Sequence, residues 1–461
     1  MASCALAAGT IDLGSLHRLH DADSLLPVLI STQHWEPFYW GQDRFGMLLP
    51  LLAWPFRDPL TNLLAQGWLA TFAGLLTFFL LARFVRVPQF WFCGLVSAAT
   101  FLVFCPAPLK AQLFLPGQPY GVSLALGLGG LLLWDVGGSA CRVAGLAMML
   151  CAHWVNVGTW LLLAPLAISR GVLARAPRTA LGDGLLVLVG AASGWGLMTI
   201  SPSHLTSRTI LSARQWPESW RLLAANAWSG AEPWLLVGAL LGSAGMVGSF
   251  LTRRNDSMHV RSATAVLIGS GLAYWLVVGT MEWVKLNASL ERYLIPAIIA
   301  LGTACIALAT APLGDWAERH VRATRAALPA TLFVAAIAAY GFPAVAGVRA
   351  DIDRVGNKAG WTDEIVAARC THLAGTYWQV WPAVFYANLL LHERAEHRAL
   401  WGVTYRGGEA RVRWSSMPRD RYRVCLAPSD PEASTWMERF GLETLMPVSE
   451  SSGLRVLSAS P

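Results

Sequence analysis

The sequence has few charged side chains. Asp, Glu, Lys and Arg make up 14% of its 461 residues, whereas an ordinary soluble domain has about 25%. The mean hydropathy is +0.46. The chain is rich in glycine, with 42 residues, and in tryptophan, with 22, which are typical of packed membrane helices and of the headgroup level respectively. This composition excludes a chain made only of soluble domains and predicts an integral membrane protein.

The motifs of nucleotide chemistry are also absent. The sequence has no Walker loop and no GxGxxG segment after a predicted strand, so nucleotide-driven chemistry is not indicated. The net charge of +7 is compatible with nucleic-acid binding. The arginines, however, fall in short loops between apolar runs, where they act as topology signals. We therefore expect no nucleic-acid partner.

Long apolar runs fill residues 46–348. Most approach the roughly 20 residues that a spanning helix needs. The runs are 60–82, 89–106, 120–134, 143–155, 158–169, 180–200, 233–251, 262–281, 292–312 and 327–348. The basic loops between these runs all lie on one side of the membrane if residues 143–169 cross it twice, with a turn near Asn156. A single crossing there would put the later basic loops on the other side. The sequence therefore predicts an all-α polytopic membrane bundle with about ten transmembrane helices.

Two further parts flank this bundle. Residues 1–45 form an acidic outer loop, and 349–461 form a small, polar α/β domain outside the membrane. Residues 1–19 are too short and too polar to span, so we expect that a first helix is missing from this sequence. We interpret the outer side as periplasmic or lumenal and the location as the bacterial inner membrane. The acidic loop and the tail lie on that outer side.

The tail contains short alternating segments. Residues 399–404, 411–414 and 421–426 have the pattern of strands, and 431–440 has the pattern of a short helix that ends at Gly441. Aromatic side chains at 375–382 suit either stacking on sugar faces or seating the tail on the bundle.

The connection at 201–232 carries an aromatic stripe. Trp216 and Trp220 recur at helical spacing, with Arg214 and Arg221 off the stripe. This pattern suits a helix that lies in the membrane interface. A plain connecting helix with snorkelling arginines explains it as well.

Cysteine is scarce outside the apolar runs. Cys370 and Cys425 are the only two in the outer tail. An oxidising compartment would allow a disulfide between them, although spacing alone does not establish its geometry.

Asp21 and Asp23 are the first candidates for chemistry, in the segment HDADS at 20–24. One carboxylate can act as a general base, and two can divide roles or share a divalent metal. The alternatives are a solvated acidic loop and a helix cap. We predict these two residues as catalytic because they lie where the chain enters the membrane.

Two basic segments on the same side suit an anionic ligand. Arg44 follows Gln42 and Asp43 where the chain re-enters lipid, and it either pairs with Asp43 or offers a donor fork to a phosphate or sugar. Arg292 opens a later helix, where it suits a phosphate or snorkels to the headgroups.

Neighbouring residues extend these two candidate sites. We assign phosphate binding to Arg44, Lys285, Arg292 and Tyr293, and substrate binding to Gln42, Asp43, His153 and Glu291. For His153, at a turn between two short crossings, a packing role is the alternative.

The sequence predicts no organic cofactor. His17 and His20 lie three residues apart beside Asp21, but without a further spaced ligand they make a poor metal site. A divalent metal held by the carboxylates stays an alternative.

The acidic outer loop at 20–23, the segment RYLIP at 292–296 and the soluble outer tail together resemble the GT-C glycosyltransferases. This group includes protein mannosyltransferases and the aminoarabinose transferase that acts on lipid A. The resemblance implies transfer of a sugar from a polyprenyl-phosphate donor to a lipid, glycan or protein acceptor at the outer membrane face. It implies that Arg292, with Arg44 or Lys285, stabilises the leaving phosphate. Asp21 or Asp23 would deprotonate the acceptor.

Two other classes of function compete with this reading. A transporter or lipid flippase usually has ionisable residues near the bilayer midplane, whereas the middles of these runs carry almost no charge. A non-catalytic membrane scaffold would tolerate substitution of the acidic loop and depend on the tail.

Overall fold

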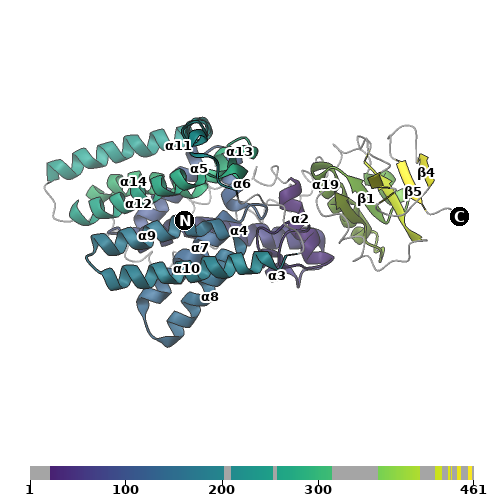
Figure 1. Ribbon diagram of the computed structural model, residues 1–461, viewed down its shortest axis with the longest axis horizontal. Helices are drawn as coiled ribbons and strands as arrows, with labels where there is room; N and C mark the ends of the chain where they lie inside the picture. Colours follow the sequence, from purple (N-terminus) through teal and green to yellow (C-terminus); the bar gives the residue numbers. More distant parts are fainter. Residues whose placement is uncertain are drawn as a thin grey trace, which may run out of the picture.

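The computed structural model describes residues 21–201, 209–252, 257–313, 362–404, 421–427, 435–436, 438, 444–447 and 455–458. Long helices gather at one end of the molecule and a small sheet lies at the other, with α2 and α3 between them (Figure 1). The described helices of the first part are α2 (Ala22–Thr32), α3 (Leu48–Ala53), α4 (Pro59–Phe84), α5 (Phe90–Phe104), α6 (Ala107–Phe114), α7 (Tyr120–Val136), α8 (Ser139–Val155), α9 (Trp160–Leu173), α10 (Pro177–Thr199), α11 (Trp216–Thr252), α12 (Ser257–Val278), α13 (Glu282–Leu286) and α14 (Ile295–Thr310). Short 3₁₀ turns are η2 (Val157–Thr159), η3 (Ala213–Gln215), η4 (Glu291–Leu294) and η5 (Ala311–Leu313).

The long helices have the length and composition of membrane spans. In the described ranges four pass this test, namely α4, α10, α12 and η4 with α14, or up to five if α8 and α9, bent by 117° at η2, count as one. On α10, Leu181, Leu185 and Leu188 recur at helical spacing and are exposed, as lipid-facing side chains are. The chain is therefore a helical membrane protein.

The expected ten crossings are not confirmed. Several apolar runs produce helices shorter than about 20 residues, for example the 15-residue α5 and the 14-residue α9. The run 327–348 lies outside the described residues. In the described ranges, turns and caps take residues from several apolar runs, so the length of a run does not by itself give a span.

The segment around residue 233 also differs from the prediction. The expected interface helix at 201–232 and the run 233–251 join in one 37-residue helix, α11. The boundary expected between these two segments falls at Pro233, but membrane helices tolerate proline because neighbouring helices compensate. Trp234 is buried against the bare backbone of Gly302 and lies edge-on to Phe101, so packing holds α11 in place just beyond the proline.

Arg170 joins four helices through a buried ionic cluster. Its guanidinium donates to Asp135 at 2.5 and 3.0 Å, to Asp183, and to the carbonyl oxygen of Phe84 at 3.4 Å. It also lies over the Phe84 ring at 4.0 Å. The sequence alone suggested a loop arginine that sets topology, but only 6% of the side chain is exposed. This arginine is part of the core.

The last part of the chain is a mixed sheet with helices. Its described elements are α18 (Thr362–Ala367), β1 (His372–Gly375), α19 (Tyr377–Glu393), β2 (Trp401–Thr404), β3 (Arg423–Leu426), β4 (Thr444–Pro447) and β5 (Arg455–Ser458). The strand order is β2-β1-β3-β5-β4, with parallel pairing across β2-β1-β3 and antiparallel pairing across β3-β5-β4. A disulfide joins Cys370 to Cys425, whose Cα atoms are 5.8 Å apart. The predicted strand 411–414 and most of the predicted helix 431–440 lie outside the described residues.

Helix α19 packs directly against α2 (Figure 1). Trp40, from the loop after α2, is buried between Trp381 of α19 and Trp401 of β2, at ring-centroid distances of 5.8 and 6.2 Å. The side-chain amide of Gln33 donates to the carbonyl oxygen of Leu400 at 2.9 Å. The outer loop and the sheet domain therefore share one core.

We expect Arg170→Met to destabilise the protein by about 3–5 kcal/mol, because it leaves the buried Asp183 carboxylate, and the more exposed Asp135 carboxylate, without their cation. Urea unfolding in detergent, followed by tryptophan fluorescence, measures the loss. Arg178→Met is the control, since Arg178 is exposed. Equal losses in the two variants would contradict a structural role for the buried cluster.

Candidate functional site

Asp21 begins α2 and caps it. One of its carboxylate oxygens accepts hydrogen bonds from the backbone N–H of Ser24 at 3.0 Å and from the Ser24 hydroxyl at 3.2 Å. This is the capping role that the sequence leaves open as an alternative.

The backbone of Asp23 is held because α2 contains a proline. Pro27 lacks an N–H, so the carbonyl oxygen of Asp23, four residues earlier, has no helical donor. The Tyr39 hydroxyl takes that place and lies 2.7 Å from the Asp23 oxygen and 2.8 Å from the Gly117 carbonyl oxygen. A Cβ on Gly117 would lie 2.7 Å from the Asp23 carbonyl carbon, so glycine allows this close approach.

The carboxylate of Asp23 is held on both oxygens. The Tyr377 hydroxyl donates to one at 2.7 Å, and the Gln118 side-chain amide donates to the other at 3.1 Å. Burial, and then the charge of Asp23, raise the pKa of Tyr377 well above its ordinary value, so the hydroxyl stays protonated and donates. Three distant segments thus meet at one half-buried carboxylate.

The two carboxylates influence each other. Removal from water and the negative charge of Asp23 raise the pKa of Asp21 to about 6, although hydrogen bonds from Ser24 oppose the shift. Two adjacent carboxylates with different surroundings can take different roles in proton transfer. Asp21 exchanges a proton near neutral pH, while Asp23 is fixed in position.

Arg44 lies at the wall of a cavity with its guanidinium over the Trp283 ring, 4.3 Å from the centroid. Its Nε donates to the buried Gln42 side chain at 2.7 Å. Gln42 therefore orients Arg44 and does not itself face the cavity. Asp43 is also buried and is absent from the cavity wall.

Arg292 and Tyr293 form the second basic element. Arg292 lies in η4, just before α14, and donates to the Tyr293 hydroxyl at 3.2 Å. Its Nε is buried and has no acceptor among the described residues. Over the same ranges neither Arg44 nor Arg292 forms an ion pair.

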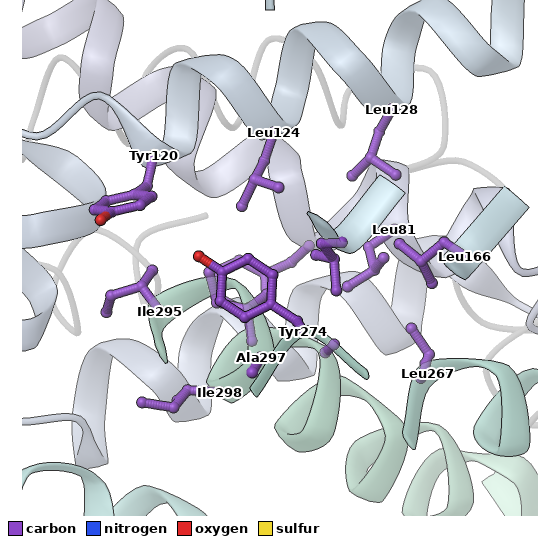
Figure 2. Close-up of a cluster of buried hydrophobic side chains, with 14 of the residues drawn as sticks. Leu81, Tyr120, Leu124, Leu128, Leu166, Leu267, Tyr274, Ile295, Ala297 and Ile298 are labelled. Carbon is purple, nitrogen blue, oxygen red and sulfur yellow. The ribbon is translucent and has the colours of Figure 1, made fainter. Parts of the chain in front are cut away.

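A cavity of about 410 Å³ lies beside these groups. Its wall is mostly aromatic and aliphatic, and it includes Phe45, Tyr120, Trp154, Trp160, Tyr274, Trp283 and Tyr293. Among the described residues that line it, Arg44 alone carries a charge. Figure 2 shows Tyr274 above Ala297 and beside Ile295, with its hydroxyl on the side nearer Tyr120. Leu81 and Leu128 lie to the right of it in this view (Figure 2) and belong to the same hydrophobic core.

Of the predicted site residues, Arg44 and Tyr293 line this cavity, and the others are absent from its wall. His153 is buried where α8 packs on α10, its Nδ1 lies 2.9 Å from the carbonyl oxygen of Met149, and Gly190 leaves room for its ring. These contacts fit the packing role that the sequence left open, and the assignment of His153 as a substrate ligand stays a prediction. Lys285 and Glu291 are half-buried on α13 and η4.

No metal centre is visible in the described ranges, where no group of three or more His, Cys, Asp or Glu side chains comes together. His17 and His20 lie outside those ranges. Each Asp23 carboxylate oxygen accepts one hydrogen bond, from Tyr377 or from Gln118, and we derive no step through a cation.

Sequence reasoning missed Tyr39, Gln118 and Tyr377. The aromatic segment 375–382 was noted, but its partner Asp23 lies 354 positions away from Tyr377. Only Pro27 offered a local signal, since a proline inside α2 predicts an unpaired carbonyl at Asp23.

Comparison with known proteins gives little further information. No protein-family model matches this sequence, and no curated protein is significantly similar to it. A structural match is found with the crystal structure of ArnT from Cupriavidus metallidurans in the apo state. The TM-score is 0.43 and the identity 12%, over 96% of this chain and 94% of that chain. At these values the likeness carries no functional argument.

We expect Asp21→Asn to change how stability depends on pH. The folded Asp21 carboxyl group has a pKa near 6 against an ordinary 3.8, so the folded state binds this proton more tightly than the unfolded state. Its contribution to stability therefore falls as the pH rises from about 4 to 6. Asparagine keeps the helix cap but removes this titration.

Thermal unfolding in detergent between pH 4 and 7 tests the point. The Tm of Asp21→Asn minus the Tm of wild type should increase as the pH rises from about 4 to 6. A difference that is constant across the range would contradict the raised pKa.

Proposed function

We propose that this protein is a membrane glycosyltransferase that moves a sugar from a polyprenyl-phosphate donor to an acceptor at the outer, periplasmic membrane face. The proposal is carried by the Asp23 carboxylate, which is held on both oxygens, together with Arg44 and Arg292, which have no carboxylate partner in the described residues. Arg44 and Tyr293 line an apolar cavity. A fixed base, an anion site and a lipid site are the three parts that this reaction needs.

The arginines supply the anion site. A cation that is partly removed from water without a counter-ion is costly, and a phosphate bound between Arg44 and Arg292 would satisfy both charges. Guanidinium groups bind phosphate oxygens through paired N–H donors. Trp283 beneath Arg44 and the Tyr293 hydroxyl beside Arg292 hold the two groups in place.

The cavity supplies the lipid site. Its aromatic and aliphatic wall suits the isoprenoid units next to the phosphate, because burial of apolar surface stabilises them there. Arg44 at that wall would contact the phosphate while the lipid chain occupies the apolar space. The donor can thus enter from the bilayer with its sugar directed toward Asp23.

Asp23 acts as the base in this scheme. It takes the proton of the acceptor hydroxyl while the acceptor oxygen forms a bond to the anomeric carbon of the sugar. The bond from that carbon to the phosphate oxygen breaks, and polyprenyl phosphate leaves with its charge stabilised by Arg292 and Arg44. The donor can be attacked from the face opposite the phosphate, so the anomeric configuration inverts.

Lipid flipping is the second candidate. The apolar cavity and the two arginines would also serve the movement of a phospholipid headgroup. Flipping does not require a carboxylate held by a tyrosine and an amide, so the behaviour of Asp23 separates the two functions.

We expect Asp23→Asn to lower turnover by about 10²- to 10⁴-fold, because it removes the general base. Sugar transfer in proteoliposomes from a panel of polyprenyl-phosphate sugars, with cell-envelope extract as acceptor, is the measurement. Asp58→Asn is the control for Asp21→Asn, since Asp58 caps α4 by accepting a hydrogen bond from the backbone N–H of Thr61, as Asp21 caps α2. If turnover falls only in Asp21→Asn, Asp21 is the base instead. If turnover is unchanged in both Asp21→Asn and Asp23→Asn, the protein is not an enzyme of this kind.

Arg292→Gln should lower kcat by about 10²- to 10³-fold, the range for removing one group that stabilises developing negative charge. Arg221→Gln, at an exposed position on α11, should behave as wild type. Consumption of the donor, measured by release of polyprenyl phosphate, reports the effect. Full activity in Arg292→Gln would place the leaving phosphate elsewhere.

A further inference from the structure

Tyr377 occupies a special position in the sheet domain. It is the first residue of α19, two residues beyond the end of the parallel strand β1, and Thr376 between them is the helix cap. Gly375 has a φ of 155°, which glycine adopts readily, and this turns the chain from strand to helix. Residues at the carboxyl end of a parallel strand project from the sheet edge, where such folds bind their ligands.

The surrounding contacts hold Tyr377 firmly. It is buried, and its ring lies edge-on to Trp381 at 6.3 Å. Trp381 in turn contacts Trp40 of the outer loop and fills the space above Gly402, where a Cβ would lie 2.3 Å from its ring. The hydroxyl of Tyr377 is therefore placed relative to α2 by the same core that joins the sheet domain to the membrane part.

We propose that Tyr377 is a positioning residue for the Asp23 carboxylate, so that docking of the C-terminal domain completes the site. This inference rests on the proposed function. The hydroxyl donates to one carboxylate oxygen at 2.7 Å, opposite the Gln118 amide on the other. With both oxygens held, the carboxylate is prevented from rotating about its terminal bond.

This arrangement leaves Asp23 able to accept a substrate proton. A carboxylate has about four lone-pair positions, and the two neutral donors use two of them. Neither donor brings a positive charge that would neutralise the base. Tyr377 thus fixes the orientation of the Asp23 carboxylate and still leaves it able to accept a proton. It does so from a domain that is remote in sequence from the membrane helices.

Tyr377→Phe removes the hydroxyl and keeps the ring. A hydrogen bond to a charged group contributes about 1.5–3 kcal/mol, which corresponds to about a 10- to 100-fold fall in kcat. The KM for the donor should stay within about twofold of wild type, because the arginines and the cavity bind the donor. Tyr386→Phe is the control. It removes another buried tyrosine hydroxyl from the same helix and should leave kcat unchanged.

A double-mutant cycle measures the contact without any turnover. Tyr377→Phe should lower Tm in the wild-type background and lower it less in an Asp23→Ala background, since the partner is already absent. Unchanged kcat in Tyr377→Phe, from a wild type that does turn over, would overturn the positioning role. So would equal shifts in Tm in the two backgrounds. A wild type that transfers no sugar from any donor would instead refute the proposed function itself, whatever the cycle shows.

Discussion

The missing backbone N–H of Pro27 is the constraint on which the site depends. It leaves the Asp23 carbonyl without a helical partner, and Tyr39 supplies one from the following loop. The same hydroxyl reaches the Gly117 carbonyl, and Gly117 allows the chain before α7 to lie against α2. Gln118, the next residue, is thereby brought within reach of the Asp23 carboxylate. One backbone defect thus determines where the acidic residue lies.

The arginines divide into two kinds by their partners. Arg170 is enclosed by two carboxylates, a carbonyl and an aromatic ring, which compensates its burial and fixes the ends of four helices. Arg44 and Arg292 are also partly buried, but their contacts in the described residues are a glutamine, a tyrosine hydroxyl and aromatic rings. Charge compensation is complete in the first case and incomplete in the second. An anionic ligand bound by Arg44 and Arg292 would therefore stabilise the folded protein in addition to taking part in the reaction.

Sequence reasoning and structure agree where the signal is local. The helix around α4, the bend near Asn156 and the strands at β2 and β3 follow from apolar runs, turn residues and alternation. The pairing of Cys370 with Cys425, left open by their spacing, depends on the register of β3 against β1. Periodicity failed at α11, where packing of Trp234 overrides the break expected at proline. At His153 the local sequence fits both a packing histidine and a substrate ligand, so it does not choose between them.

The sequence by itself determined that this is a membrane protein with a polar tail, since a chain with few charges and long apolar runs is stable only with those runs in a lipid bilayer. It also identified Asp21, Asp23, Arg44 and Arg292 as candidate functional residues, because a charged side chain near the membrane costs free energy and is expected to bind a ligand or take part in chemistry. Only the tertiary structure decided which role each residue has. Asp21 caps α2, Asp23 has its carboxylate held by Tyr377 and Gln118, and the two arginines have no carboxylate partner in the described residues. Tyr377 and Asp23 lie 354 positions apart, and no periodicity relates two residues at that separation. Their contact exists because the aromatic core around Trp40 docks the sheet domain onto α2, and such packing depends on the shapes of surfaces that form only when the whole chain has folded.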